Sequence, residues 1–185
     1  MKPYVVAIAG GTCSGKSTLA DALNAALNEN YRVKLFNMDS YFKNPTPTVI
    51  APITGIEYPE HNHPDALKLD ELRRDFEEAC AGTFDVILIE GLFALYLDWI
   101  RQRADLKIFV DLKSDARLAR RIVKHMKRGQ TYDQVVDRYL DTVRFRHDEL
   151  IEPTRWHADA VVNGTQNLGT EMLTSYIECK IKESE

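Results

Sequence analysis

The sequence predicts an α/β fold in which helices cover both faces of a parallel β-sheet. Short apolar runs alternate with helical patterns along the 185 residues, as a sheet with helical crossovers requires. The runs are almost entirely apolar, which is typical of strands that are buried on both faces. The first run leads directly into a glycine-rich turn and a helix. We expect one domain over residues 1–185, because this length suits a single hydrophobic core.

The five apolar runs are expected to form a five-stranded parallel core. They cover residues 4–10, 32–38, 85–91, 106–112 and 159–164. Helical patterns occupy residues 16–28, 68–80, 114–127, 132–148 and 166–182. In the last helix, a stripe that we expect to pack on the core is made of Leu168, Met172, Tyr176, Ile177 and Ile181.

One region breaks this alternation. Residues 44–65 contain five of the seven prolines, so they form neither a regular helix nor a central strand. The segment is too long for a simple connection and too apolar for a linker. Long structured loops usually serve a function, and we interpret residues 40–66 as a loop beside an acceptor molecule.

Composition excludes several classes of protein. The formal net charge of −4 argues against a general affinity for nucleic acid polymers. The scattered Cys13, Cys80 and Cys179 fit neither a disulfide framework nor a zinc site, which favours a reducing cytoplasm. The N-terminal run reads as a first strand rather than a signal peptide, and we expect no membrane span. The oligomeric state is not determined by these features, and a homo-oligomer stays open.

The glycine-rich turn fits the pattern G-x-x-x-x-G-K-[ST], known as Walker A, through Gly10, Gly15, Lys16 and Ser17. Glycines let the backbone wrap around an anion, and the N–H groups at the start of the following helix point at phosphate. The lysine reaches the β- and γ-phosphates, and the serine hydroxyl binds Mg²⁺. The predicted nucleotide-binding residues of this loop are Gly10, Gly11, Thr12, Cys13, Ser14, Gly15, Lys16, Ser17 and Thr18.

A GTPase switch and a motor ATPase are disfavoured. In this chain no glycine has an aspartate three positions before it, so the D-x-x-G signal is absent, as is N-K-x-D. A helicase or transport ATPase would need a longer chain. The loop therefore favours phosphoryl transfer to a small molecule.

Two carboxylates end predicted strands at the edge where ligands bind in open α/β sheets. Asp39 follows the second strand, where it can accept a proton from an attacking hydroxyl, although a turn aspartate is the simpler alternative. Glu90 ends the third strand and suits a magnesium shell. Tyr41 and Phe42 are positioned to stack on an acceptor, and Phe42 fits the core equally well.

A basic stripe follows the fourth strand. It consists of Arg117, Arg120, Arg121, Lys124, Lys127 and Arg128. A solvated helix face is one interpretation. We favour a lid over residues 117–131 that closes on phosphates and excludes water, with Arg117, Arg120 and Lys124 binding the nucleotide.

Taken together, the segments "GGTCSGKST", "DSYF", "NHPDAL", "ILIEG", "KIFVD", "RLARRI" and "ADAVVNG" resemble the uridine kinase family. This family is part of the phosphoribulokinase/uridine kinase group of P-loop kinases. The resemblance covers residues 5 to about 164 and implies a three-layer P-loop NTPase fold of the nucleoside/nucleotide kinase type. It also implies transfer of the γ-phosphate of ATP, with Mg²⁺, to the 5′-hydroxyl of a nucleoside.

By position, the resemblance also implies roles for individual residues. Asp39 matches the general base, Glu90 the metal-shell carboxylate, and Arg121 a lid arginine that reaches phosphate and ribose. The expected catalytic residues are Asp39, Lys16 and Arg121. The expected acceptor residues are Asp39, Tyr41, Asn62, His63 and Arg121, and the expected metal ligands are Ser17 and Glu90.

Two departures leave the acceptor open. Asn62 stands where the family usually has an aspartate that binds the ribose hydroxyls. Pyrimidine-specific members carry a β-hairpin between the "HPDA" segment and the third strand, where this chain has one helix. A kinase of nicotinamide riboside or pantothenate, or an ATP-binding regulator or ATPase, therefore stays an alternative. His61, His63 and Asp65 also alternate like metal ligands, although turn or acceptor residues fit better.

Overall fold

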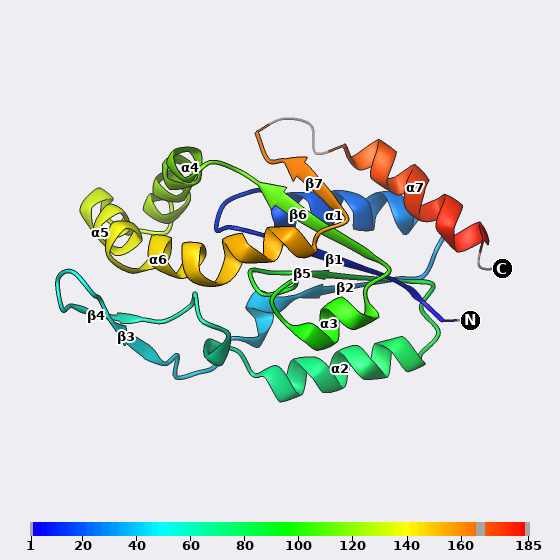
Figure 1. Ribbon diagram of the computed structural model, residues 1–185, viewed down its shortest axis with the longest axis horizontal. Helices are drawn as coiled ribbons and strands as arrows, with labels where there is room; N and C mark the ends of the chain where they lie inside the picture. The colour runs from blue at the N-terminus through cyan, green and yellow to red at the C-terminus, as the bar shows by residue number, and fades with distance from the viewer. Residues whose placement is uncertain (1, 166–168, 184–185) are drawn as a thin grey trace.

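The computed structural model describes residues 2–165 and 169–183, and its centre is a five-stranded parallel sheet (Figure 1). The strand order is β2-β5-β1-β6-β7. Every neighbouring pair in this sheet is parallel, so the predicted fold class is confirmed. The strands are β1 (Tyr4–Gly10), β2 (Val33–Asn37), β5 (Val86–Glu90), β6 (Leu106–Asp111) and β7 (Ala160–Asn163).

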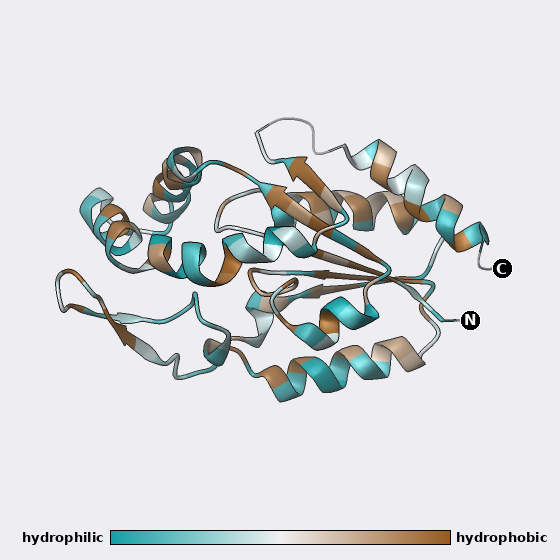
Figure 2. Cartoon of the chain, in the orientation of Figure 1, coloured by the Kyte–Doolittle hydropathy of each residue, from teal (hydrophilic) through white to brown (hydrophobic). Residues whose placement is uncertain are grey.

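Helices cover both faces of the sheet, which gives three layers. On one face lie α1 (Lys16–Leu27) and α7 (Thr170–Glu183), and on the other lie α2 (Leu69–Ala81) and α3 (Asp98–Arg103). Alternate residues of β1 enter the two cores, because successive side chains of a strand point to opposite faces. The central strands are accordingly the most hydrophobic part of the chain (Figure 2).

The predicted stripe on α7 is partly wrong. Ile177 and Ile181 are buried against the sheet, as expected, but their partner is Leu173. Met172 and Tyr176 are 67% and 46% exposed, because the docking face of α7 is rotated by one residue from the predicted stripe. The first residue of that stripe, at position 168, lies outside the described residues.

The basic helix and the elements after it gather at the carboxyl end of the sheet (Figure 1). They are α4 (Ser114–Met126), α5 (Tyr132–Arg138) and α6 (Arg144–Arg146). The predicted helix over 132–148 extends to His157 through two π-helical turns, Tyr139–Val143 and His147–Ile151, and a final 3₁₀ segment. Such wide turns often accompany functional sites. Within the described residues, no helix has both the length and the apolar character needed to cross a membrane.

The proline-rich segment contains an unpredicted β-hairpin, β3 (Thr48–Ile50) and β4 (Glu57–Pro59), which is separate from the main sheet. Its turn is held by Asp141, which is 3% exposed and lies in the first π-helical turn. The carboxylate accepts hydrogen bonds from the N–H groups of Ile53 (3.2 Å) and Thr54 (3.3 Å) and from the Thr54 hydroxyl. The hairpin is therefore fixed to the helices across the sheet edge.

We expect Asp141→Ala to lower the free energy of unfolding by about 2 kcal/mol, because the variant leaves the N–H groups of the hairpin turn without their acceptor. Urea unfolding of the variant measures this loss. Asp148→Ala, at an exposed position of the same helical stretch, is the control and should change stability little. Equal stabilities of the two variants would show that the hairpin is held by other contacts.

Gly164, directly after β7, lies against the glycine-rich turn. A Cβ atom there would overlap the Ser14 carbonyl oxygen and lie 3.1 Å from the Asp111 carbonyl oxygen. Gly164→Ala should therefore cost about 1–3 kcal/mol of stability through overpacking. Thermal unfolding tests this prediction against Gly82→Ala, where the nearest atom would be 3.3 Å away. A melting temperature unchanged from the wild type would rule out the close contact.

Candidate active site

The glycine-rich loop spans the carboxyl edge of the sheet, since β1 ends at Gly10 and α1 begins at Lys16. Its backbone has positive φ values of 151° at Gly10, 59° at Cys13 and 110° at Gly15. Alternation of this kind turns successive N–H groups into a concave anion-binding surface. The N-terminus of α1 adds its positive end at the same place.

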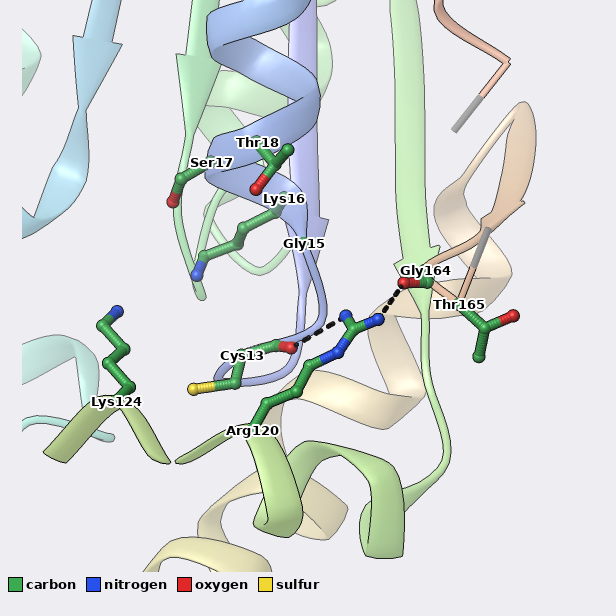
Figure 3. A pocket seen from close by; sticks show the side chains of 9 residues that line it. All are labelled: Cys13, Gly15, Lys16, Ser17, Thr18, Arg120, Lys124, Gly164 and Thr165. Carbon is green, nitrogen blue, oxygen red and sulfur yellow. Dashed lines mark hydrogen bonds between the residues drawn. The ribbon is translucent and has the colours of Figure 1, made fainter. Parts of the chain in front are cut away.

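A cavity of about 460 Å³ opens above this loop (Figure 3). Its wall contains the cations Lys16, Arg120 and Lys124. Arg120 donates hydrogen bonds to the carbonyl oxygens of Gly164 (2.8 Å) and Cys13 (3.5 Å), so the basic helix is attached to the loop. The lining is completed by Cys13, Gly15, Ser17, Thr18, Gly164 and Thr165. The cavity thus combines backbone N–H groups with positive charge, which suits a polyphosphate.

Glu90 and Ser17 lie together at the base of the loop. The Ser17 hydroxyl donates to Glu90 Oε1 at 3.1 Å. Glu90 is 2% exposed, and its Oε2 atom has no hydrogen-bond partner within the described residues. Burial raises the pKa of the Glu90 carboxyl, and the nearby Lys16 ammonium opposes this effect. A buried oxygen without a partner beside a hydroxyl and a lysine fits a divalent cation, because Mg²⁺ prefers oxygen ligands.

A second cavity of about 720 Å³ adjoins the first, and Cys13, Lys16, Ser17 and Lys124 line both. Asp39, in the 3₁₀ turn Met38–Tyr41 after β2, lines only the second cavity. The Asn37 side chain caps this turn by accepting from the Asp39 N–H at 2.9 Å. Asp39 and Lys16 therefore line one cavity, and the role of Asp39 near a reacting phosphate stays a prediction.

The lid arginines have different surroundings. Arg121 is 7% exposed, lines the second cavity and donates to the Thr12 hydroxyl at 3.0 Å. Arg117 is 3% exposed and lines neither cavity, so its predicted contact with the nucleotide stays a prediction. Its Nε donates to the Leu112 carbonyl at 3.0 Å, and its guanidinium lies behind Gly11, where a Cβ would be 2.7 Å from Nη1. Arg117 therefore supports the loop from behind.

For part of the basic stripe, these positions exclude the interpretation as a helix face exposed to solvent. Arg117 and Arg121 are buried, whereas the apolar Val123 and Met126 on the same helix are 56% and 48% exposed. The Arg117, Arg120 and Arg121 side chains of α4 thus contact the loop. Closure of residues 117–131 as a lid stays a prediction.

Two predicted acceptor residues lie elsewhere. The Tyr41 hydroxyl donates to Asp75 on α2 at 3.0 Å, and the ring packs on the core, while the next residue, Phe42, lines the second cavity. His63 caps the 3₁₀ turn Pro64–Ala66, its Nδ1 accepting from the Asp65 N–H at 3.2 Å. The proline after His63 could have indicated this capping position.

Sequence reasoning missed several residues of the second cavity. His61 lines it in place of His63, and Arg138 reaches it from α5, outside the predicted lid. Asn62, which was predicted, lies there with 8% exposure, and its N–H donates to Glu60 at 2.6 Å. Asn37 and Leu92 are further unpredicted lining residues, whereas His125, Arg128 and Gln130 fall within the predicted lid of residues 117–131. Within the described residues no group of three or more His, Cys, Asp or Glu side chains is placed to hold a metal.

Solved structures share the fold. A candidate fructose transport system kinase of Silicibacter sp. TM1040 superimposes with a TM-score of 0.67 at 21% identity, covering 86% of this chain and 89% of that one. Shikimate kinase of Bacteroides thetaiotaomicron gives a TM-score of 0.52 at 16% identity, covering 97% and 98%. Both likenesses confirm the α/β architecture.

Sequence relatives are closer. The uridine kinase of Lactobacillus helveticus is 30% identical, with 98% of this chain and 97% of the relative covered. The uridine kinase of Macrococcus caseolyticus is 31% identical, with 98% of both covered. Uridine-cytidine kinase B of Dictyostelium discoideum is 29% identical, over 99% of this chain and 84% of that one. Residues 55–171 match the model of the phosphoribulokinase/uridine kinase family. The chain therefore belongs to the phosphoribulokinase/uridine kinase family.

Proposed function

We propose that this protein transfers the γ-phosphoryl group of ATP to the 5′-hydroxyl of a nucleoside. The observation that carries this proposal is the pair of cavities that meet at Lys16 and Ser17, with an anion-binding loop in one and the Asp39 carboxylate in the other. The relatives named as uridine kinases over nearly the whole chain support the same reaction. In this proposal residues 1–185 form one kinase domain that acts in the cytoplasm.

On the donor side, the loop N–H groups and Lys16 hold the β- and γ-phosphates, while Arg120 and Lys124 lie along the same cavity. The Ser17 hydroxyl and the Glu90 carboxylate are the groups that would hold Mg²⁺, directly or through water. When bound, this ion neutralises charge on the phosphate oxygens. Glu90 sits at the end of a buried strand, so its position relative to Ser17 does not depend on a loop.

On the acceptor side, Asp39 takes the proton of the 5′-hydroxyl while the hydroxyl oxygen bonds to the γ-phosphorus. The bond between that phosphorus and the β,γ-bridging oxygen breaks, and ADP leaves. Because the transition state is loose, most of the catalysis comes from positioning and charge. In this proposal Lys16 and the buried Arg121, which line the same cavity, stabilise that charge.

The acceptor end differs from that of pyrimidine-specific relatives. Between the "HPDA" segment and β5, α2 is the only described helix or strand, so the base-contacting hairpin of those enzymes is absent there. The alignment with the Lactobacillus helveticus enzyme spans 208 positions against 185 residues here, so that enzyme holds at least 208 − 185 = 23 residues without a counterpart. Asn62 can still hydrogen-bond ribose hydroxyls through its amide. We therefore propose a nucleoside acceptor without assigning uracil as its base.

Incubation with γ-labelled ATP and a panel of nucleosides, ribosides and pantothenate tests this function. A labelled nucleoside 5′-monophosphate is the expected product. Labelled pantothenate phosphate alone would indicate another metabolite kinase. Label found only as inorganic phosphate, whatever the acceptor, would favour the ATPase alternative.

Asp39→Asn should leave ATP binding nearly intact and lower kcat by about 10²-fold or more, since the amide cannot accept the hydroxyl proton. Asp65→Asn is a matched control on the acceptor loop, because Asp65 lies outside the cavity. Lys16→Ala should abolish transfer. Unchanged turnover in the Asp39 variant would remove this carboxylate from the mechanism.

Glu90→Gln should raise the Mg²⁺ concentration needed for half-maximal rate by about 10-fold or more, as loss of a carboxylate beside a metal commonly does. A magnesium titration at fixed ATP concentration measures this shift. Asp85→Asn, one residue before the start of the same strand, serves as the control and should leave the magnesium dependence unchanged. Identical titration curves for the Glu90 variant and the wild type would exclude Glu90 from the metal site.

A further inference from the structure

Arg138 is a cation of the acceptor cavity that the proposed chemistry does not use. It projects from α5 and lines the cavity beside His61. Its Nη2 donates to the Pro59 carbonyl oxygen at 2.6 Å and lies 3.2 Å from His61 Nδ1. Its Nε is buried without a hydrogen-bond partner within the described residues. The guanidinium is therefore oriented by the acceptor loop, with donor capacity left over.

The positive charge of Arg138 is compensated only in part. No carboxylate of residues 2–165 and 169–183 forms an ion pair with it. The charge of the buried Glu60 acts on Arg138 from beyond ion-pair distance. Glu60 itself pairs with Arg146 at 3.1 Å and accepts from the Asn62 N–H at 2.6 Å. A partly buried arginine that hydrogen-bonds only a carbonyl and a histidine, with Glu60 already paired to another arginine, gains stability when a ligand supplies further negative charge.

The cavity around Arg138 is strongly cationic. Its lining holds five permanent cations, Lys16, Arg121, Lys124, Arg128 and Arg138, and one carboxylate, Asp39. The pKa of His125 is lowered to about 4 by burial and then by the positive charges of Arg121, Arg128 and Lys124. This low pKa reflects the positive charge of the cavity. Burial and the charge of Arg138 likewise lower the pKa of Arg121.

ATP accounts for some of these cations but not for Arg138. Lys16 and Lys124 line the donor cavity as well, and Arg121 donates to Thr12 of the phosphate loop. The polar contacts of Arg138, by contrast, are to Pro59 and His61 on the acceptor loop. Its charge is thus directed at the part of the acceptor that lies away from the phosphate loop.

We infer that Arg138, beside His61, binds a carboxylate carried by the base of the acceptor nucleoside. This inference rests on the proposed function and names its substrate class. A planar guanidinium matches a carboxylate through paired N–H donors. Phe42, whose ring packs edge-on against His61 at 4.9 Å between centroids, offers an aromatic wall for the ring of the base. Asn62 is compatible with this class, because an aspartate there would repel an anionic acceptor.

Two matched pairs of nucleosides test the inference: uridine with 5-carboxyuridine, and nicotinamide riboside with nicotinate riboside. The measured quantity is the ratio of kcat/KM for the carboxylated member to that for the neutral-substituent member. We expect the wild type to prefer the carboxylated member of at least one pair by roughly tenfold or more, as one charge-assisted hydrogen bond provides. A wild type that prefers the other member of both pairs would overturn the inference.

Variants of Arg138 distinguish binding of the acceptor carboxylate from a purely structural role in holding the acceptor loop. Arg138→Gln should bring the ratio close to one while the KM for ATP stays unchanged, and Arg138→Lys should keep part of the preference. Arg144→Gln, an arginine of the same helical stretch outside the cavity, should keep the full ratio. If Arg138→Gln lowers kcat/KM equally for both members, Arg138 only fixes the loop, and the inference fails.

If the proposed kinase function is wrong, the labelling experiment gives a different result. In that case label from ATP would reach no nucleoside of either pair, and calorimetry with the intact protein would replace kinetics. Binding of a carboxylated nucleoside that is lost in Arg138→Gln would still support the carboxylate site. Equal binding of all four nucleosides to wild type and variant would overturn it.

Discussion

The position of β1 in the middle of the sheet is the constraint on which the site depends. β1 is hydrogen-bonded to β5 on one side and β6 on the other, so its carboxyl end cannot shift without breaking both pairings. The register sets Ile8 opposite Glu90 and Gly10 opposite Val110. The anion-binding loop, the buried carboxylate and the start of α4 are thereby placed relative to one another by backbone geometry. The side chains of the site therefore extend from backbone positions that are fixed relative to one another.

The charged side chains at this edge of the sheet are mostly positive, whereas the net charge of the chain is negative. The protein carries 28 acidic and 24 basic residues, yet the charged residues that line the two cavities are cations with the single exception of Asp39. β6 and α4 produce this arrangement, because the helix leaves the sheet with its basic face toward the loop. Arg117 and Arg121 are buried there without ion-pair partners among the described residues. Such a cluster is unfavourable in isolation, and bound phosphate is the natural compensation.

A site residue could be predicted from the sequence when its position depends only on neighbouring residues. Glu90 ends a strand, and the phosphate loop and Asp39 follow within two residues of a strand end, so the position of that end is enough to place them. The hairpin, His61 and Arg138 depend on contacts between distant segments, such as Thr54 with Asp141 and Pro59 with Arg138. No periodicity in residues 44–65 reports those contacts. Tyr41 and His63 do not line the second cavity, because Tyr41 bonds to Asp75 and His63 caps the turn that follows it. Neither of these contacts could be predicted from the sequence.

The central claim is that one phosphoryl group passes between two cavities that meet at Lys16. An analogue in which a nucleoside is joined through its 5′-oxygen to ATP by a phosphate chain would span both. Inhibition kinetics with this analogue test the claim most directly. The account predicts tight inhibition that is competitive toward ATP and toward the nucleoside. Competition with ATP alone, at an affinity no higher than that of ATP, would show that the two cavities do not form one site.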